Sequence, residues 1–205
     1  MATVLYIQAS PMGKLSASIA AADAFIEEYK KLNPADKIKI INIFDMDLPE
    51  FDFAAASAKY KIIHQKEHTN EDKQIWSKIL AVITEFKSAD KYVFAVPMWN
   101  FSIPWRLKQY IDVIVQPGQT FGFDSAGNYV GLVLGKKAVC LYARGGKYIG
   151  GGEAYDMQSK YFGQILGFMG IIDVKNIFIE PTLAPGADKV IDEAVVNAKK
   201  ATSGF

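Results

Sequence analysis

The sequence has few of the residues that bind metals or form disulfides. Its 205 residues include one cysteine, Cys140, and two histidines, His64 and His68. A single cysteine excludes an internal disulfide framework and a cysteine-rich metal site. We expect Cys140 to be a buried strand residue and not a redox thiol. No Ser-His-Asp or Cys-His arrangement indicates nucleophilic catalysis either.

Long apolar runs and an excess of one charge are also missing. Lys or Asp interrupts each candidate membrane span, and 23 basic against 22 acidic residues leave a net charge of +1. This balance gives no general attraction to nucleic acid or to an anionic membrane. The N-terminus lacks the ordered segments of a signal peptide. We therefore expect a cytoplasmic protein with a single domain over residues 1–205 and no nucleic-acid or membrane partner.

The sequence does contain a regular alternation of strands and helices. Short apolar runs predict strands at 4–7, 38–43, 92–96, 138–142 and 171–179. Apolar residues at helical spacing predict helices at 19–32, 75–86, 107–114, 157–169 and 190–200. The alternation predicts an α/β, doubly wound parallel sheet of five strands with helices on both faces. We adopt for it the order 2-1-3-4-5, the flavodoxin-like order that is one of the two common ones for such sheets.

Two segments interrupt this alternation. Residues 47–70 are expected to be irregular or partly helical. Residues 119–134 have aromatic residues on both sides of Ala-Gly-Asn and predict a hairpin insert. Phe121 and Phe123 on this hairpin are candidates either for a lid over a site or for a brace in a dimer.

The loop ASPMGKLSAS after the first strand is a candidate phosphate site. In a doubly wound sheet, ligands bind where loops leave the carboxyl ends of the strands, and a helix N-terminus presents free N–H groups to anions. Ser10, Ser16 and Ser18 add hydroxyl groups. The loop is no Walker A motif, because Leu follows its Gly-Lys pair, and G-x-G-x-x-G is absent. A plain helix cap is the alternative interpretation.

Two further strand ends carry candidate ligand contacts. After the third strand, residues 98–101 (MWNF) offer a flat apolar surface with one hydrogen-bonding edge. After the fourth strand, Gly145 and Gly146 allow backbone N–H groups to approach a ligand closely. The alternatives are aromatic rings that roof the core and glycine turns without function. Because the first, third and fourth strands are neighbours in the predicted order, the three loops converge, and FMN has the matching phosphate and planar ring.

Five segments resemble, in order and spacing, the FMN-dependent NADH-azoreductases and NADH:quinone oxidoreductases. They are ASPMGKLSAS, PMWNFSIPWRLKQYID, TFGFDSAGNYVGLVLGKKA, ARGG and LGFMGIIDV. The resemblance is weakest over residues 47–73, and the segment Gly131–Lys137 (GLVLGKK) is fairly specific to that family.

The resemblance implies a flavodoxin-like homodimer with one FMN per subunit. NADH, or NADPH, would reduce FMN and leave before a quinone or aromatic azo compound takes two electrons in the same space, a ping-pong exchange in which flavin N5 does the chemistry and no residue is catalytic. The implied FMN contacts are Ser10, Ser16, Ala17, Ser18, Pro97, Met98, Trp99, Asn100, Phe101, Ala143, Arg144, Gly145 and Gly146. The implied substrate contacts are Phe121, Phe123 and Tyr148.

Four positions depart from the residues common in that family. Ala17 stands where many members have Gln, and Ala143 where many have Ser, which removes side-chain contacts and leaves backbone donors. Trp99 replaces a frequent Tyr and Tyr148 a common His, which changes the surroundings of the ring. Arg144 is expected either to contact phosphate or substrate or to bridge two subunits.

Other functions match parts of the sequence. His64, Glu67 and His68 have the H-x-x-E-H spacing, which on a helix could bind zinc. They lie in a charged segment and the chain has no third His, so we predict no metal site. The main alternative is a flavodoxin-type electron carrier without a small-molecule substrate, although such carriers are usually strongly acidic. A phosphodiesterase is rejected, because no nucleophile–base pair is visible.

Overall fold

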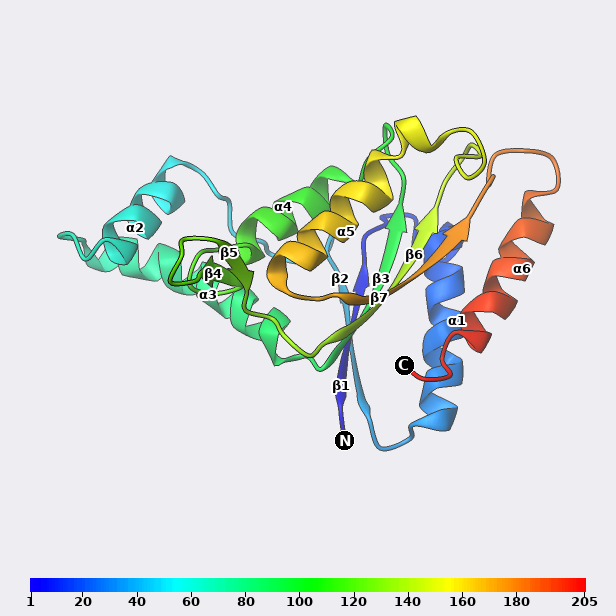
Figure 1. Cartoon of the computed structure of the whole chain (residues 1–205), viewed down its shortest axis with the longest axis horizontal. Helices are drawn as coiled ribbons and strands as arrows, with labels where there is room; N and C mark the ends of the chain where they lie inside the picture. Colours follow the sequence, from blue (N-terminus) through cyan, green and yellow to red (C-terminus); the bar gives the residue numbers. More distant parts are fainter.

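A five-stranded parallel sheet forms the centre of the computed structural model, which describes all 205 residues (Figure 1). Its strands are β1 (Thr3–Gln8), β2 (Lys37–Asn42), β3 (Lys91–Pro97), β6 (Lys137–Ala143) and β7 (Asp173–Ile179). They lie in the order β2-β1-β3-β6-β7, and every pair is parallel. Because β4 and β5 form a separate hairpin, this is the predicted order 2-1-3-4-5, which is confirmed.

Helices cover both faces of the sheet (Figure 1). α1 (Ala17–Leu32) and α6 (Ala187–Lys200) pack together over one face, and the other face carries α3 (Asn70–Ser88), α4 (Trp105–Ile114) and α5 (Met157–Met169). Alternate residues of β1 point into the two resulting cores. A strand buried on both faces needs a continuous apolar run, which explains the pattern of the sequence. None of the helices combines the length and the apolar composition that a membrane span requires.

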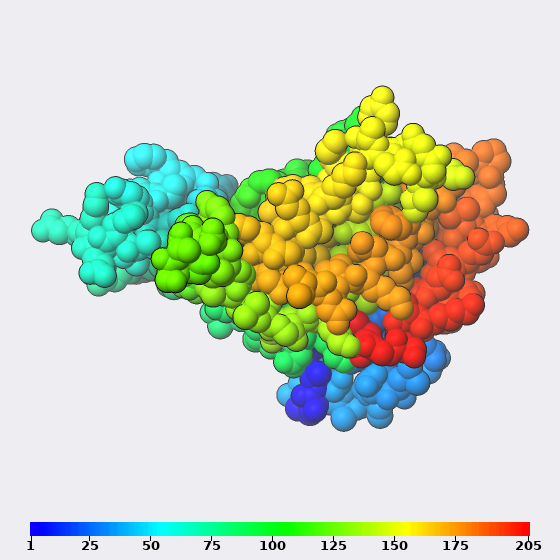
Figure 2. Space-filling model, in the orientation of Figure 1, coloured from blue at the N-terminus to red at the C-terminus, as the bar shows by residue number.

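The segment 47–70 contains one helix, α2 (Phe53–Ile63), which agrees with the partly helical prediction. The Asp52 carboxylate accepts a hydrogen bond from the Ala55 N–H at 2.9 Å and caps this helix. α3 begins at Asn70, earlier than predicted, because Thr69 and Asp72 form a capping box at its start. α2 packs on α3 and forms a lobe that projects from the rest of the molecule (Figure 2).

The predicted hairpin is confirmed as β4 (Phe121–Phe123) paired antiparallel with β5 (Tyr129–Gly131). It lies against the C-terminal end of α5, where the Val133 N–H donates to the Met169 carbonyl at 2.8 Å. A Cβ atom on Gly131 would lie 2.3 Å from the backbone nitrogen of Gly170. Only glycine at 131 therefore permits this close approach.

Candidate functional site

The carboxyl ends of β1, β3 and β6 lie next to one another at one edge of the sheet (Figure 1). The Ala9 N–H donates to the Ala95 carbonyl at 2.9 Å, and the Met98 N–H donates to the Ala143 carbonyl at 2.7 Å. These bonds join the starts of the three loops that follow the strands. The loops that the sequence predicted to converge are therefore brought together.

The loop after β1 both caps α1 and leaves donors free. Ser16 is the N-cap, with its Oγ 3.5 Å from the Ile19 nitrogen and 3.0 Å from the Ser18 Oγ. Ser10, Ser16 and Ser18 are all buried. The N–H groups of Ala17 and Ser18 make no hydrogen bond within the chain. A helix start with free N–H groups and clustered hydroxyls is suited to a phosphate group.

The loop after β3 contains a tight turn with unusual backbone geometry. Trp99 and Ser102 exchange two backbone hydrogen bonds of 2.9 Å each. Between them, Asn100 and Phe101 adopt φ values of 49° and 68°. Asn tolerates this left-handed region, whereas for Phe it costs roughly 1–2 kcal/mol. Such strain is concentrated at functional sites because the surrounding structure must maintain it.

The turn is held at the surface by α5. The Met157 N–H at the start of α5 donates to the Phe101 carbonyl at 3.0 Å. The side chains of Trp99 and Phe101 are 37% and 51% exposed, so they do not roof the core. The Tyr148 ring lies 6.4 Å from the Phe101 ring, which adds the predicted substrate residue to this group.

A cavity of about 450 Å³ adjoins the turn. Its walls come from the loop after β3, from α4 and from α5. The lining residues are Trp99, Asn100, Ser102, Ile103, Trp105, Lys108 and Tyr161. A cavity of this size with mostly apolar walls suits a flat aromatic molecule.

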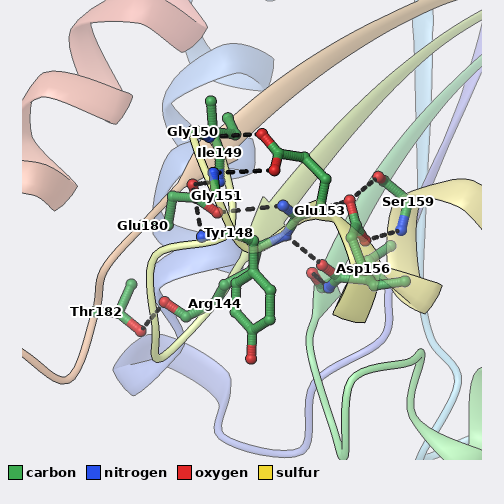
Figure 3. A network of polar contacts seen from close by, with 12 residues as sticks. Arg144, Tyr148, Ile149, Gly150, Gly151, Glu153, Asp156, Ser159, Glu180 and Thr182 are labelled. Atoms are coloured by element: carbon green, nitrogen blue, oxygen red, sulfur yellow. Dashed lines mark hydrogen bonds and ion pairs between the residues drawn. The ribbon is translucent and has the colours of Figure 1, made fainter.

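The backbone N–H groups of the loop after β6 fall into two sets, one free and one hydrogen-bonded. The N–H groups of Gly145, Gly146 and Lys147 make no hydrogen bond within the chain. Those of the next four residues, Tyr148–Gly151, donate to the carboxylates of Glu180 and Glu153 (Figure 3). Neither Gly145 nor Gly146 has a positive φ, so their conformation itself does not demand glycine. At Gly146 the missing side chain leaves the N–H group accessible, whereas at Gly145 it also makes room for Leu183, whose Cδ1 would lie 2.7 Å from a Cβ atom.

The side chain of Arg144 does not lie where it was predicted to lie. The guanidinium is buried, with Nη2 2.7 Å from Asp156 and Nη1 3.2 Å from Glu180. Its Nε donates to Gln158 at 2.9 Å, and the guanidinium lies 4.4 Å from the centre of the Phe178 ring. Since these groups belong to the same chain, the side chain neither reaches the crevice nor bridges subunits. Only the backbone of Arg144 remains available to a ligand.

Asp156 is one of the residues that sequence reasoning missed. Burial alone would raise its pKa, but hydrogen bonds from Ser159 and the nearby Arg144 cation hold the pKa of this carboxyl below its usual value. Its position directly before a predicted helix was the available signal, because Asp is a favoured N-cap. Glu180 follows the last strand and carried no comparable signal.

Phe121 and Phe123 do not join the crevice of their own chain. The Phe121 ring packs 4.6 Å from the Phe168 ring at the C-terminal end of α5. The turn with Phe101 contacts the opposite end of this 13-residue helix, which is ~20 Å long. Within one chain these residues therefore do not cover the crevice, and a lid or a dimer brace formed by them in an assembly stays a prediction.

The positions of the two histidines do not support the zinc hypothesis. His64 is the C-cap of α2, and residues 65–69 are not helical, so the two histidines share no helical face. No group of three or more His, Cys, Asp or Glu residues could hold a metal ion. Cys140 is buried as predicted, and burial raises the pKa of its thiol to about 12. A thiol of this kind is unreactive at neutral pH.

Comparison with known proteins agrees with this architecture. Residues 2–201 match the model of a family with the flavodoxin-like fold. An FMN-dependent NADH:quinone oxidoreductase of Nitratidesulfovibrio vulgaris is 46% identical over 190 residues, covering 92% of this chain and 90% of that protein. Another protein with this name, from Staphylococcus aureus, is 36% identical over the full length of both chains.

Solved structures show the same similarity. The crystal structure of an FMN-dependent NADH-azoreductase from Bacillus anthracis in complex with FMN has a TM-score of 0.91 to this chain. The two are 30% identical, over 99% of this chain and 98% of the other. The chain therefore belongs to the flavodoxin-like family that contains the FMN-dependent NADH:quinone oxidoreductases and NADH-azoreductases. The resemblance inferred from the sequence is confirmed.

Proposed function

We propose that the protein is an FMN-dependent NADH oxidoreductase that reduces quinones and aromatic azo compounds. The observation that carries this proposal is the distribution of free backbone donors at one edge of the sheet. Ala17 and Ser18 offer N–H groups at the start of α1, and Gly145–Lys147 offer them after β6. Between them lies the turn with the exposed rings of Trp99 and Phe101. This arrangement matches a phosphate, a planar ring and a polar ring edge.

The residues present fit FMN even though the side chains of Ala17 and Ala143 cannot form hydrogen bonds to it. Ser10, Ser16 and Ser18 would hold the phosphate together with the free N–H groups. Residues 97–101 would flank the ring, and the backbone of 143–146 would face its pyrimidine edge. When bound, FMN accepts a hydride from NADH and passes two electrons to the acceptor.

The chain's own contribution is orientation and electrostatics. The donors of Gly145 and Gly146 would stabilise negative charge at the pyrimidine edge, because they are fixed before the reaction begins. The rigid turn of residues 99–102 would leave one ring face accessible, and the adjoining cavity would admit donor and acceptor in succession. NADPH is proposed as a second electron donor. The protein is further proposed to be a homodimer and to lie in the cytoplasm.

An absorption spectrum of the purified protein tests this function. The protein is supplemented with FMN if colourless, and anaerobic NADH is then added. Flavin bands that NADH bleaches promptly, followed by recovery on adding menadione or an azo dye, would support the proposal. Bound flavin that NADH does not bleach would favour the electron carrier, and no flavin binding would overturn both.

A further inference from the structure

Glu180 connects the loop after β6 to the end of β7. Its Oε1 accepts hydrogen bonds from the Tyr148 and Ile149 N–H groups at 3.1 and 2.7 Å. Its Oε2 accepts from Nη1 of Arg144 at 3.2 Å. The side chain is only 6% exposed, and Figure 3 shows it between Arg144 and the loop. It follows Ile179, the buried last residue of β7, whose carbonyl accepts the Arg144 N–H at 3.0 Å.

The two loop N–H groups that donate to Glu180 follow directly, in sequence, on the three N–H groups that have no partner. Gly145, Gly146 and Lys147 have unpartnered N–H groups, and the Glu180 carboxylate takes the next two in sequence. A loop fixed at both ends of a three-residue segment can hold those three N–H groups in one arrangement. Without Glu180, the segment would still be fixed on the side of β6, where the Thr182 and Leu183 N–H groups donate to the Arg144 and Gly145 carbonyls at 2.8 and 3.2 Å. At its other end only the Gly152 N–H would remain, which donates to the Tyr148 carbonyl at 2.9 Å within the loop itself.

The same network reaches the aromatic turn. Arg144 donates to the Gln158 side chain, and the Gln158 amide donates to the Val96 carbonyl at the end of β3 at 2.9 Å. Gln158 follows Met157, whose N–H holds the Phe101 carbonyl. Glu180 and Arg144 thus connect the loop after β6 to the turn after β3 through buried contacts.

We propose that Glu180 is a positioning residue that holds the N–H groups of Gly145–Lys147 in place for the pyrimidine edge of FMN. The inference rests on the proposed function, because it assigns these donors to FMN. Glu180 acts through the backbone of the loop and does not itself touch the cofactor. A carboxylate is needed, because it must accept from the loop and from Arg144 at the same time.

Glu153 provides a matched control in the same loop. Its carboxylate also accepts two backbone hydrogen bonds, from Gly150 and Gly151 at 2.6 and 2.9 Å. However, Glu153 is exposed, belongs to the loop itself and makes neither a hydrogen bond nor an ion pair with Arg144, whose polar partners are Gln158, Glu180 and Asp156. Shortening it should loosen only the distal half of the loop.

The test compares Glu180→Asp with Glu153→Asp. Both substitutions keep the charge and retract the carboxylate by one methylene group. We expect Glu180→Asp to raise the dissociation constant for FMN at least about tenfold and to make the midpoint potential of bound FMN more negative, because fewer fixed donors face its pyrimidine edge. In flavin-free protein, hydrogen–deuterium exchange at the Tyr148 and Ile149 amides, which donate to Glu180, should become faster. Glu153→Asp should leave the dissociation constant and the potential unchanged.

The outcomes separate this inference from the proposed function. If the wild type does not bind FMN, both are overturned. If the wild type and Glu180→Asp bind FMN equally well with the same potential, only the role of Glu180 is overturned. Should Glu180→Asp not fold, Glu180→Gln keeps the length but turns its NH₂ group toward Arg144, and it should weaken FMN binding similarly. If neither variant folds, Glu180 is required for the fold itself and the positioning role fails.

Discussion

At the residue scale, Gly146 offers a test of ligand access that is separate from stability. A Cβ atom built on it would lie 3.5 Å from the nearest atom, in the Tyr148 ring, which is an ordinary contact. We expect Gly146→Ala to fold with stability within about 0.5 kcal/mol of the wild type. It should nevertheless weaken FMN binding several-fold, because the methyl group would occupy the space through which the backbone approaches the ring.

Thermal unfolding of flavin-free protein and an FMN titration would check both parts. Gly163→Ala is the control, because a Cβ atom there meets nothing within 4 Å and Gly163 lies inside α5. Alanine stabilises a helix interior by about 0.5–1 kcal/mol relative to glycine, and FMN binding should not change. Unchanged FMN binding in Gly146→Ala would contradict the assignment of this backbone to the site.

The individual site residues were predictable to different degrees. Small, hydroxyl-bearing and aromatic residues that directly follow an apolar strand can be recognised in the sequence, and Ser16, Phe101 and Gly146 were predicted in this way. The partners of Arg144 were not, because Glu180 lies 36 residues further along the chain. Only the packing of β6 beside β7 brings these two charges together.

At the scale of elements, the ion pair between α2 and α3 gives a prediction for acid conditions. Lys61 lies 3.0 Å from Asp72. The hydrogen bond from the Thr69 N–H, with that from Lys61, lowers the pKa of Asp72 from 3.8 to about 2. Because the folded state lowers this pKa, the stabilisation is fully present above about pH 4. It is lost as the pH falls toward 2.

Asp72→Asn should therefore be less stable than the wild type at neutral pH, and the difference should shrink as the pH falls from about 4 through 2. Urea unfolding of both proteins across this range would measure the difference. Asp112→Asn is a suitable control, since Asp112 pairs with Lys108 on an exposed helix surface, where ion pairs contribute little. A difference between wild type and Asp72→Asn that stays constant between pH 4 and pH 2 would show that the carboxylate charge is not the cause.

The contact between the hairpin and α5 gives a second test at this scale. Gly131→Ala would drive a methyl group into the backbone of Gly170. We expect a loss of about 1–3 kcal/mol, the usual range for overpacking, with faster hydrogen exchange in residues 121–134. Gly122→Ala, in the same hairpin, should be nearly neutral, because its Cβ atom would meet the Leu132 side chain at 3.6 Å. Similar losses in both variants would contradict the steric explanation.

The elements themselves were largely predictable, and α2 shows where this ends. Buried parallel strands and amphipathic helices have periodic patterns that do not depend on distant contacts, and so these elements and the hairpin followed from the sequence. The sheet order did not follow from periodicity, and its prediction depended on the orders that doubly wound sheets commonly adopt. α2 has the sequence FAAASAKYKII, in which apolar residues do not keep to one face. Its place is determined by α3, through Lys61 and Asp72, and a single segment of sequence contains no such information.

At the scale of the whole molecule, the hairpin exposes apolar side chains. Phe123, Tyr129 and Leu134 are 59%, 65% and 68% exposed. Figure 2 shows this hairpin at the surface beside the lobe formed by α2. The Phe123 and Tyr129 rings lie 5.0 Å apart, and exposed apolar patches of this kind mark interaction sites in soluble proteins. The two cores share the residues of one sheet, which supports the prediction that residues 1–205 form a single domain.

We expect a second copy of the chain to cover this hairpin. Within one chain, Phe121 and Phe123 lie at the end of α5 away from the Phe101 turn, so they can contribute to a site only in a partner subunit. Light scattering should give twice the mass of the chain for the wild type and the monomer mass for Phe123→Asp. Leu32→Asp, at an exposed position of α1 on the opposite face of the sheet, should remain dimeric.

The same variant separates the assembly from the cofactor site. All residues assigned to FMN lie in one chain, and therefore monomeric Phe123→Asp should bind FMN with an affinity within a few-fold of the wild type. Its reduction of menadione should fall by more than tenfold if the partner's hairpin completes the acceptor space, because a missing wall costs orientation of the acceptor. A monomeric variant with full activity would assign Phe121 and Phe123 to assembly alone. A wild type that is monomeric and fully active would leave the exposed hairpin without either role.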